Sequence, residues 1–396
     1  MATALVRLPG HLAHPFSPAG RADPYPAYRW LRENDPVHFD PASRMWLLTS
    51  HADCSAALRD DGLSAAQGQR ERARDDDLPP SMLTTDAPDH QRLRAPGTLL
   101  LGPAAIRSVA DRIAAEADAL LDRAPRVLDA TSGIGVPLAT AVFAALFGLP
   151  DAERPRFELL ARAASVNLDP MAGPEAAAAG RRAMGELTRY LDAHARELTV
   201  RGDTSPLAVF ASDERLSRAE MLGVLGLAVV GGWQPLAEAV GNGLAWLLPR
   251  PEVMARLHTG GDELARSAMD ELLRLEAPIP FTARVATRQV RLPGGTIPAG
   301  ARVLSVLAAA NRDAAVFARP DELVPDRSPN PHLAFGAGPH FCLAAQLVRQ
   351  TGAVLLARLA GRFPGARALT DAPDWDGGRL IPRRLRAFPL SLYGTE

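Results

Sequence analysis

Residues 333–349 read LAFGAGPHFCLAAQLVR and place one cysteine, Cys342, behind two glycines and ahead of an apolar helix. Gly336 and Gly338 allow the backbone to turn tightly, and a helix is expected from Leu343 onward. Free backbone N–H groups and the positive end of the helix dipole then converge on Cys342. Such a position favours the thiolate over the thiol.

Three interpretations of Cys342 compete. An anionic sulfur with an apolar helix behind it and the Phe335 ring in front suits the axial ligand of haem iron, because thiolate donates electron density to the iron. A lone cysteine in a chain rich in alanine and leucine is more often an inert buried side chain. A dinucleotide-binding turn at GAGPHF is disfavoured, because the third glycine is missing and no acidic residue follows at the required distance.

The same stretch resembles the cysteine loop of the cytochrome P450 family, which reads F-G-x-G-x-H-x-C-x-G. The matching positions are Phe335, Gly336, Gly338, His340 and Cys342. Ala344 stands where glycine is usual, which is a small departure. The resemblance implies haem b with iron bound by the Cys342 thiolate, and Phe335, Gly336 and Ala344 beside the cofactor. It also implies a mainly α fold with small β-sheets (α+β) and a long central helix over the haem.

Composition limits the class of protein. The chain has 396 residues and no linker-like run, so one domain over residues 1–396 is expected. Apolar residues make up 47%, enough for a sizeable core, and a net charge of −1 gives no reason to expect nucleic acid. Cys54 and Cys342 are too few for a disulfide framework, and no Cys/His cluster has zinc spacing. We expect a cytoplasmic monomer.

Two segments bear on membrane association. The N-terminal residues MATALVRLPGHLAHPF lack the apolar core of a signal peptide. The long apolar run Met221–Leu248 is interrupted by glycines, a proline and polar side chains, Glu238 and Asn242 among them. A buried central helix is therefore expected there rather than a membrane span.

The rest of the chain is mostly helical in pattern. Pro36–Phe39 and Met45–Thr49 predict a small hairpin, and the polar segment Gly62–Asp86 predicts a surface loop that acts as a lid. Asn167–Gly173 predicts a second mobile loop. Helices are expected at Ala104–Arg123, Val136–Phe147, Glu153–Ser165 and Pro174–Leu198, and strands and turns over Gly361–Glu396.

The centre of the apolar run reads Gly231-Gly232-Trp233-Gln234-Pro235. Pro235 has no N–H for the Gly231 carbonyl, so a kink is expected at the proline. Two glycines beside the kink would permit close approach by a flat ligand.

Most cytochrome P450 sequences read [AG]-G-x-[DE]-T at this place, with an acid and an alcohol that help to deliver protons. Gln234 and Pro235 occupy those positions here and neither can release a proton. The candidate catalytic residues are Gly231, Gly232, Gln234 and Pro235. Protons could come from ordered water or from an acidic proton of the substrate, such as a phenol that is oxidised and coupled, or activity could be lost.

Four basic side chains could hold a dianionic cofactor. His90 and Arg94 are spaced i, i+4 on one helix face, which is equally compatible with a solvated surface. By resemblance this pair, with Arg284, reaches the haem propionates, and His332 is a further candidate. Together they would balance a buried dicarboxylate.

Glu271 and Arg274 are spaced i, i+3 on a helix that ends before Pro278. A surface pair of this kind contributes little and is common by chance. The family's E-x-x-R pair instead forms a buried network with an arginine before the cysteine loop, which would be Arg327 here.

The resemblance therefore implies a haem-thiolate oxidase or monooxygenase that uses O2 and electrons from a separate ferredoxin and its reductase. Apolar residues of the lid, central helix and later turns favour an apolar or aromatic small molecule or natural-product intermediate. These residues are Met82, Leu83, Val229, Val230, Trp233, Ile279, Phe281 and Ile381. Oxidative cross-linking of tyrosine-type or peptide substrates is an alternative, and a non-catalytic partner protein with the same fold is a second one.

Overall fold

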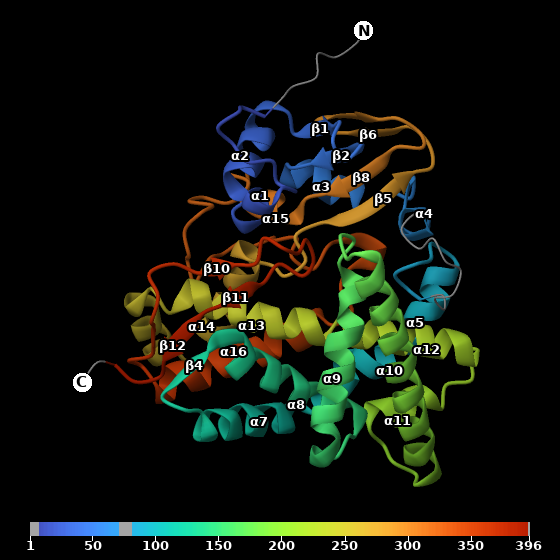
Figure 1. Cartoon of the computed structure of the whole chain (residues 1–396), viewed down its shortest axis with the longest axis vertical. Helices are drawn as coiled ribbons and strands as arrows, with labels where there is room; N and C mark the ends of the chain where they lie inside the picture. Colours follow the sequence, from blue (N-terminus) through green and yellow to red (C-terminus); the bar gives the residue numbers. More distant parts are fainter. Residues whose placement is uncertain (1–7, 71–80, 395–396) are drawn as a thin grey trace.

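The computed structural model describes residues 8–70 and 81–394. Its centre is a long helix in two parts, α12 (Arg218–Val230) and α13 (Trp233–Leu247), separated at Gly231–Gly232. Ser217 and Glu220 begin α12 with a capping box, in which each side chain accepts the backbone N–H of the other residue. The two parts together cross the molecule beneath the strands in Figure 1.

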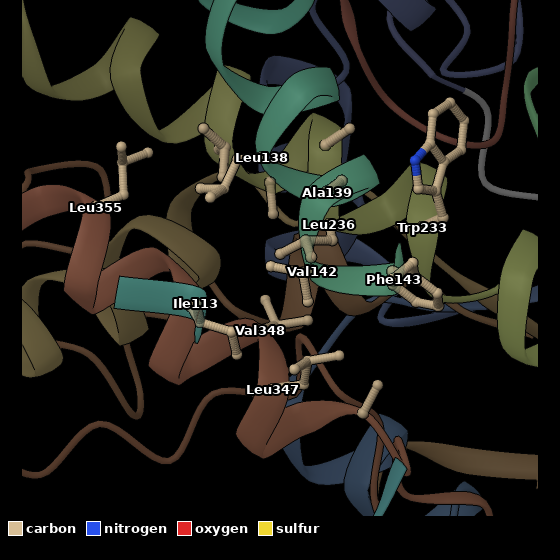
Figure 2. Close-up of a cluster of buried hydrophobic side chains, with 14 of the residues drawn as sticks. Ile113, Leu138, Ala139, Val142, Phe143, Trp233, Leu236, Leu347, Val348 and Leu355 are labelled. Atoms are coloured by element: carbon tan, nitrogen blue, oxygen red, sulfur yellow. The ribbon is translucent and has the colours of Figure 1, made fainter. Parts of the chain in front are cut away.

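A bundle of helices surrounds α13. Its members are α7 (Ala110–Arg123), α8 (Val136–Phe147), α14 (Pro251–Leu275) and α16 (Ala345–Arg362). In Figure 2, Leu138 and Val142 of α8 meet Leu236 of α13, while Leu347 and Val348 of α16 lie below them. Because nearly every side chain of α8 is buried, this helix has no polar face and sits inside the bundle.

A second group of helices covers the first part of the central helix. It comprises η3 (Ser165–Leu168), α9 (Arg154–Ala164), α10 (Pro174–Val200) and α11 (Pro206–Ala211). Helix α10 packs along α9, and both contact α12. The link between α9 and α10 holds the predicted second loop, whose first residues form η3.

A five-stranded sheet caps one end, drawn in blue and orange at the top of Figure 1. Its order is β1-β2-β8-β5-β3, with bounds β1 (Val37–Asp40), β2 (Met45–Leu48), β8 (Arg302–Ser305), β5 (Thr282–Ala286) and β3 (Leu63–Ser64). Strand β8 runs parallel to β2 and antiparallel to β5, with Val303 opposite both Trp46 and Arg284. The sheet thus joins segments more than 200 residues apart in sequence.

Smaller sheets complete the strands. They are β6 (Val290–Leu292) with β7 (Gly295–Ile297), β10 (Asp374–Trp375) with β11 (Leu385–Ala387), and β12 (Pro389–Ser391) between β4 (Val127–Asp129) and β9 (Arg367–Ala368). The short helical elements are α1 (Pro18–Ala22), α2 (Tyr25–Asn34), α3 (His51–Ala57), α4 (Ala65–Arg70), α5 (Asp89–Leu101), α6 (Pro103–Ser108), α15 (Leu307–Ala310), η1 (Thr131–Gly135), η2 (Asp151–Glu153) and η4 (Gly338–His340).

The mainly α fold with small sheets is confirmed, and so is the hairpin, now β1 and β2. The loop predicted over Gly62–Asp86 is wrong at its start, where β3 pairs with β5 and α4 follows it. The pairing partner of β3 lies far along the chain, so local pattern could not reveal it. Residues 71–80 of that segment lie outside the described residues.

The span Arg218–Leu247 is long and apolar enough to cross a membrane by length and composition alone. In the structure 78% of its most apolar window is buried among the other helices. This burial identifies it as a core helix, as the sequence predicts.

Candidate functional site

The cysteine loop closes through two glycines. Gly336 and Gly338 have φ angles of 69° and 70°, a region that glycine enters without steric cost. A Cβ at Gly338 would lie 2.5 Å from the carbonyl oxygen of Leu58. The Cys342 N–H donates to the Phe335 carbonyl at 2.9 Å, which holds the half-buried cysteine just before α16.

Ala344, which replaces the usual glycine, has φ −87° and ψ 8° at the start of α16. Any residue reaches these angles without strain. The structure therefore explains why alanine is accepted at this position.

Burial raises the pKa of the Cys342 thiol, and this effect outweighs the lowering by the Ala344 backbone hydrogen bond and by Arg94 and Arg349. In the protein alone, burial thus opposes the thiolate that the start of the helix is expected to favour. Coordination to a metal ion reverses the balance, because a coordinating thiol is deprotonated outright. The loop suits a metal-bound thiolate better than a free one.

Four basic side chains from distant parts of the chain converge next to this loop. They are His90 and Arg94 of α5, Arg284 of β5 and His340 of η4. The rings of His90 and His340 are in contact, with centroids 4.1 Å apart and their planes tilted by 45°. Arg94 donates to the carbonyl of Phe341, the neighbour of Cys342, at 2.7 Å. We call these four residues the cationic cluster.

Two members of the cationic cluster, His90 and Arg284, are buried, Arg94 and His340 are half-buried, and the cluster is short of negative charge. Arg284 is 5% exposed and donates only to neutral acceptors among the described residues, the Thr282 hydroxyl at 2.7 Å and the Ala283 carbonyl at 2.8 Å. Burial, and then the positive charges of Arg284, His90 and Arg94, lower the pKa of His340 to about 4. His90 is 2% exposed, and neither ring nitrogen has a hydrogen-bond partner among the described residues.

These observations test whether the site fits haem. Unsatisfied buried donors are costly, and a dicarboxylate beside them would satisfy them. Asp86 is the nearby acid that acts on His90, His340 and Arg284, but it already accepts from the Ser64 hydroxyl and the Ala65 N–H. A thiol next to four basic side chains, two of them buried, fits a haem with its two propionates.

His332 does not belong to the cationic cluster, contrary to the expectation. Its Nε2 lies 3.2 Å from Asp270 Oδ1, and its Nδ1 accepts the Ala334 N–H at 3.2 Å. Both ring nitrogens are therefore engaged beside α14. His340 belongs to the cationic cluster instead, and its sequence signal is the histidine of the cysteine-loop motif, two residues before the cysteine.

The interruption of the central helix lies at Gly231–Gly232, ahead of the proline. Gly232 has φ −114° and ψ −57°, and a Cβ there would lie 2.6 Å from the Phe143 ring. Pro235 falls in the first turn of α13, where a missing N–H costs nothing because that turn has no helical acceptor. The break thus falls at the residue whose carbonyl Pro235 cannot bond, Gly231, as the sequence predicts.

The helix break is open to solvent. Gly231 is exposed and Pro235 half-exposed, although both lie in the middle of a buried helix. Gln234 is buried, and its amide Nε2 donates to the carboxylate of Glu238. Sequence reasoning missed Glu238, because a single acid in an apolar run gives no sign of its partner.

The predicted pocket residues separate into two groups. Met82, Val229, Val230 and Trp233 lie in the main helical core, whereas Ile279, Phe281 and Ile381 pack with Tyr28 and Leu304 near the sheet. Leu83 is half-buried. Trp233 is fully buried, with its indole N–H donating to Thr140 Oγ1 at 3.1 Å. It points toward α8 in Figure 2, so we do not retain it as a pocket residue.

Glu271, Arg274 and Arg327 form an ion-pair network of the predicted kind. Glu271 and Arg274 are both 0% exposed and pair through two bonds of 2.7 and 2.8 Å. Arg327 Nε lies 3.0 and 2.9 Å from the two Glu271 oxygens. Arg274 also donates to the carbonyls of Asn311 and Pro320, so the network fastens α14 to the segment before the cysteine loop.

Comparison with known proteins agrees with this geometry. The family model "Cytochrome P450" matches residues 187–364. Nocardicin C N-oxygenase from Nocardia uniformis subsp. tsuyamanensis is 33% identical, over 93% of this chain and 96% of the relative. Vitamin D(3) 25-hydroxylase from Pseudonocardia autotrophica is 34% identical, over 88% of each chain.

Solved structures show the same fold. The crystal structure of CalO2 superposes with a TM-score of 0.87 at 29% identity, covering 96% of this chain and 98% of that one. P450BioI in complex with hexadec-9Z-enoic acid ligated acyl carrier protein gives a TM-score of 0.83 at 25% identity, covering 93% and 98%.

Proposed function

The chain is a member of the cytochrome P450 family and hence a haem-dependent oxidoreductase, and on this premise we propose an oxygenase of an apolar or aromatic small molecule or natural-product intermediate. One observation carries the proposal. Arg94 belongs to the cationic cluster and also bonds to the residue next to Cys342, so the cofactor's carboxylates and its iron ligand have binding residues side by side.

Each group of residues has its own role in the proposed site. Cys342 would ligate the iron, and His90, Arg94, Arg284 and His340 would bind the propionates, while Phe335 and Gly336 shape the cysteine loop. When bound, haem supplies the redox-active iron for reaction with O2. The substrate would lie at the helix break beside exposed Gly231, while Gly232 lets Phe143 of α8 pack closely against the break. Gln234 and Pro235 occupy the positions of the usual acid and alcohol but offer no acidic proton.

Two relatives are named for oxygenations, an N-oxygenase and a 25-hydroxylase, which supports oxygen transfer as the reaction class. We further propose that electrons come from a ferredoxin and its reductase, and that the protein is a cytoplasmic monomer with a single haem-thiolate domain. The cysteine and the cationic cluster are both intact, which argues against a non-catalytic partner protein.

Oxidative aromatic coupling remains the second candidate, because the Gln234–Pro235 pair lacks the usual proton donors and a phenolic substrate would bring its own. The substrate class is tested by adding candidate ligands, phenolic peptides included, to the haem protein and recording the haem spin state. We expect an apolar or aromatic compound to shift it. If only strongly polar compounds bind, the proposed substrate class is wrong.

The mass of the product distinguishes the two reactions. Oxygen insertion adds about 16 Da, whereas coupling removes two hydrogens and about 2 Da. We expect the gain of one oxygen with the ligand that binds best. A product that lacks two hydrogens and carries no added oxygen would show that the reaction is coupling and not oxygenation.

Restoring the acid and alcohol should alter how electrons are used. In Gln234→Glu combined with Pro235→Thr, a proton donor returns to the helix break, so we expect more product per electron and less peroxide. Glu197→Gln, at an exposed position of α10 away from the break, is the control and should leave both quantities unchanged. Equal product and peroxide yields in the double variant and the wild type would show that proton supply at these positions does not limit the reaction.

A further inference from the structure

Glu238 is a buried acid one turn after Gln234 on α13. It is 2% exposed, and its Oε1 accepts the Gln234 amide N–H. Its Oε2 has no hydrogen-bond partner within the described part of the chain. A buried carboxylate oxygen without a partner is costly, whereas a protonated Oε2 is a neutral donor that can bond to a water molecule.

Charged groups face Glu238 from two other elements without pairing with it. Arg162 of α9 is bonded instead to Glu158 at 2.9 Å, and Arg384, near the C-terminus, to Asp376 at 2.8 Å. Arg379 is the third arginine that acts on Glu238. Burial outweighs these positive charges and the Gln234 hydrogen bond, and raises the pKa of Glu238 to about 7. The carboxyl therefore gains and loses its proton near neutrality.

The position of Glu238 connects this acid to the helix break. Residues four apart lie on the same face of a helix, so Glu238 and Gln234 share one face and Gln234 is the member nearer to exposed Gly231. On the other side, the side chains of Arg162 and Arg384 are 50% and 30% exposed, which brings solvent close. Glu238 thus lies between the opening at the break and the surface.

We propose that Glu238 holds the proton for the reaction at the helix break, with Gln234 positioning its carboxyl group. The inference rests on the proposed oxygenase function and supplies the acid that the sequence of the break lacks. Relative to the usual acid position, the proton-holding group is displaced by one helical turn.

The proton balance is simple. The Oε2–H bond of Glu238 breaks as its proton passes to a water molecule at the break, which leaves a carboxylate on Glu238. The Gln234 N–H continues to donate to Oε1 and stabilises that charge. A proton from solvent on the arginine side then restores the acid, so no electron is gained or lost.

Two substitutions separate this role from a structural one. Glu238→Gln keeps the length of the side chain and an acceptor for Gln234, so a purely structural role would survive it. Glu238→Asp shortens the side chain but keeps the acid, so a proton-holding role should be partly restored by it. Asp192→Asn is the control, because Asp192 is a buried acid that is already paired, with Arg196 of α10 and with Arg218 at the start of α12.

Infrared spectroscopy of the haem-loaded protein tests the protonation directly. We expect a carbonyl stretch of a protonated carboxyl group that disappears as the pH rises through about 7. The band should be absent in Glu238→Gln and retained in Asp192→Asn. A band that titrates identically in Glu238→Gln would overturn the proposal.

Stability gives a second readout. Because the pKa is raised from 4.5 in the unfolded chain to about 7, the folded chain binds the proton more tightly. The resulting stabilisation is present at low pH and is lost as the pH rises from about 4.5 through about 7. Glu238→Gln should flatten the fall of unfolding free energy over this window, and an unchanged slope would contradict the assignment.

Activity completes the test. Oxygen consumption driven by a ferredoxin and its reductase should fall about 100-fold in Glu238→Gln, the lower end of general-acid effects, and recover partly in Glu238→Asp. Unchanged consumption in Glu238→Gln would reject the role of Glu238. The thiolate-type haem spectrum should persist in every variant, and its absence already in the wild type would reject the proposed function itself.

Discussion

Cys342→Ala is expected to abolish the thiolate-type haem spectrum completely. The variant removes the sulfur but leaves the cationic cluster, so some haem can still bind through its propionates without the axial thiolate. Absorption spectra of the purified, haem-reconstituted variant measure this loss. Because Cys342 precedes α16 and its backbone N–H still donates to Phe335, we expect the circular dichroism of the fold to be retained.

Cys54→Ala is the matched control. Cys54 is the other cysteine, fully buried, with its Sγ donating to the Leu48 carbonyl at 3.2 Å. Burial raises its thiol pKa, so it stays neutral and unreactive. The Cys54 variant should keep the thiolate spectrum, and a thiolate spectrum that survives in Cys342→Ala would assign the iron ligand to another residue.

Glu271→Gln is expected to cause the largest loss of stability among single substitutions. It leaves Arg274, fully buried, and Arg327, nearly so, without their shared anion, and breaking a buried ion pair typically costs about 3–5 kcal/mol. The free energy of unfolding in urea measures the cost. Haem should also be retained less well, because the network holds the segment that precedes the cysteine loop.

An exposed pair on α10 is the control. Glu197 and Arg201 lie 3.8 Å apart with both side chains mostly exposed, so solvent screens them. Glu197→Gln should leave the unfolding free energy almost unchanged. Equal, small losses in both variants would mean that the buried network adds no more than a surface pair.

The sequence predicted the features that depend on neighbouring residues. The Cys342 loop is one continuous motif, and its two glycines have the positive φ angles that such a turn requires. The hairpin β1–β2 has a short turn between its strands, so its pairing is local. The same holds for most helices, whose apolar faces repeat along one segment.

Features that depend on contacts between distant parts of the chain could not be predicted from the sequence. His332 and His340 are both histidines near the cysteine, and only the packing of Asp270 against one and of His90 against the other decides their roles. Strand β3 could not be predicted from local sequence, because its pairing partner β5 lies far along the chain.

The surroundings of Glu238 at the helix break could not be predicted from the sequence either. In the sequence it interrupts an apolar run, which by itself indicates only that the run is not a membrane span. Its burial, its bond to Gln234 and the arginines that face it come from α9, α13 and the C-terminal segment together. Proton supply at the break is therefore a property of the folded chain.

The central claim is that Cys342 binds haem iron as a thiolate. Its most direct test is the carbon monoxide difference spectrum of the reduced wild-type protein, expressed with ample haem precursor. We predict the band of thiolate-ligated haem, with one haem bound per chain. A colourless protein, or a haem spectrum without that band, would contradict the claim.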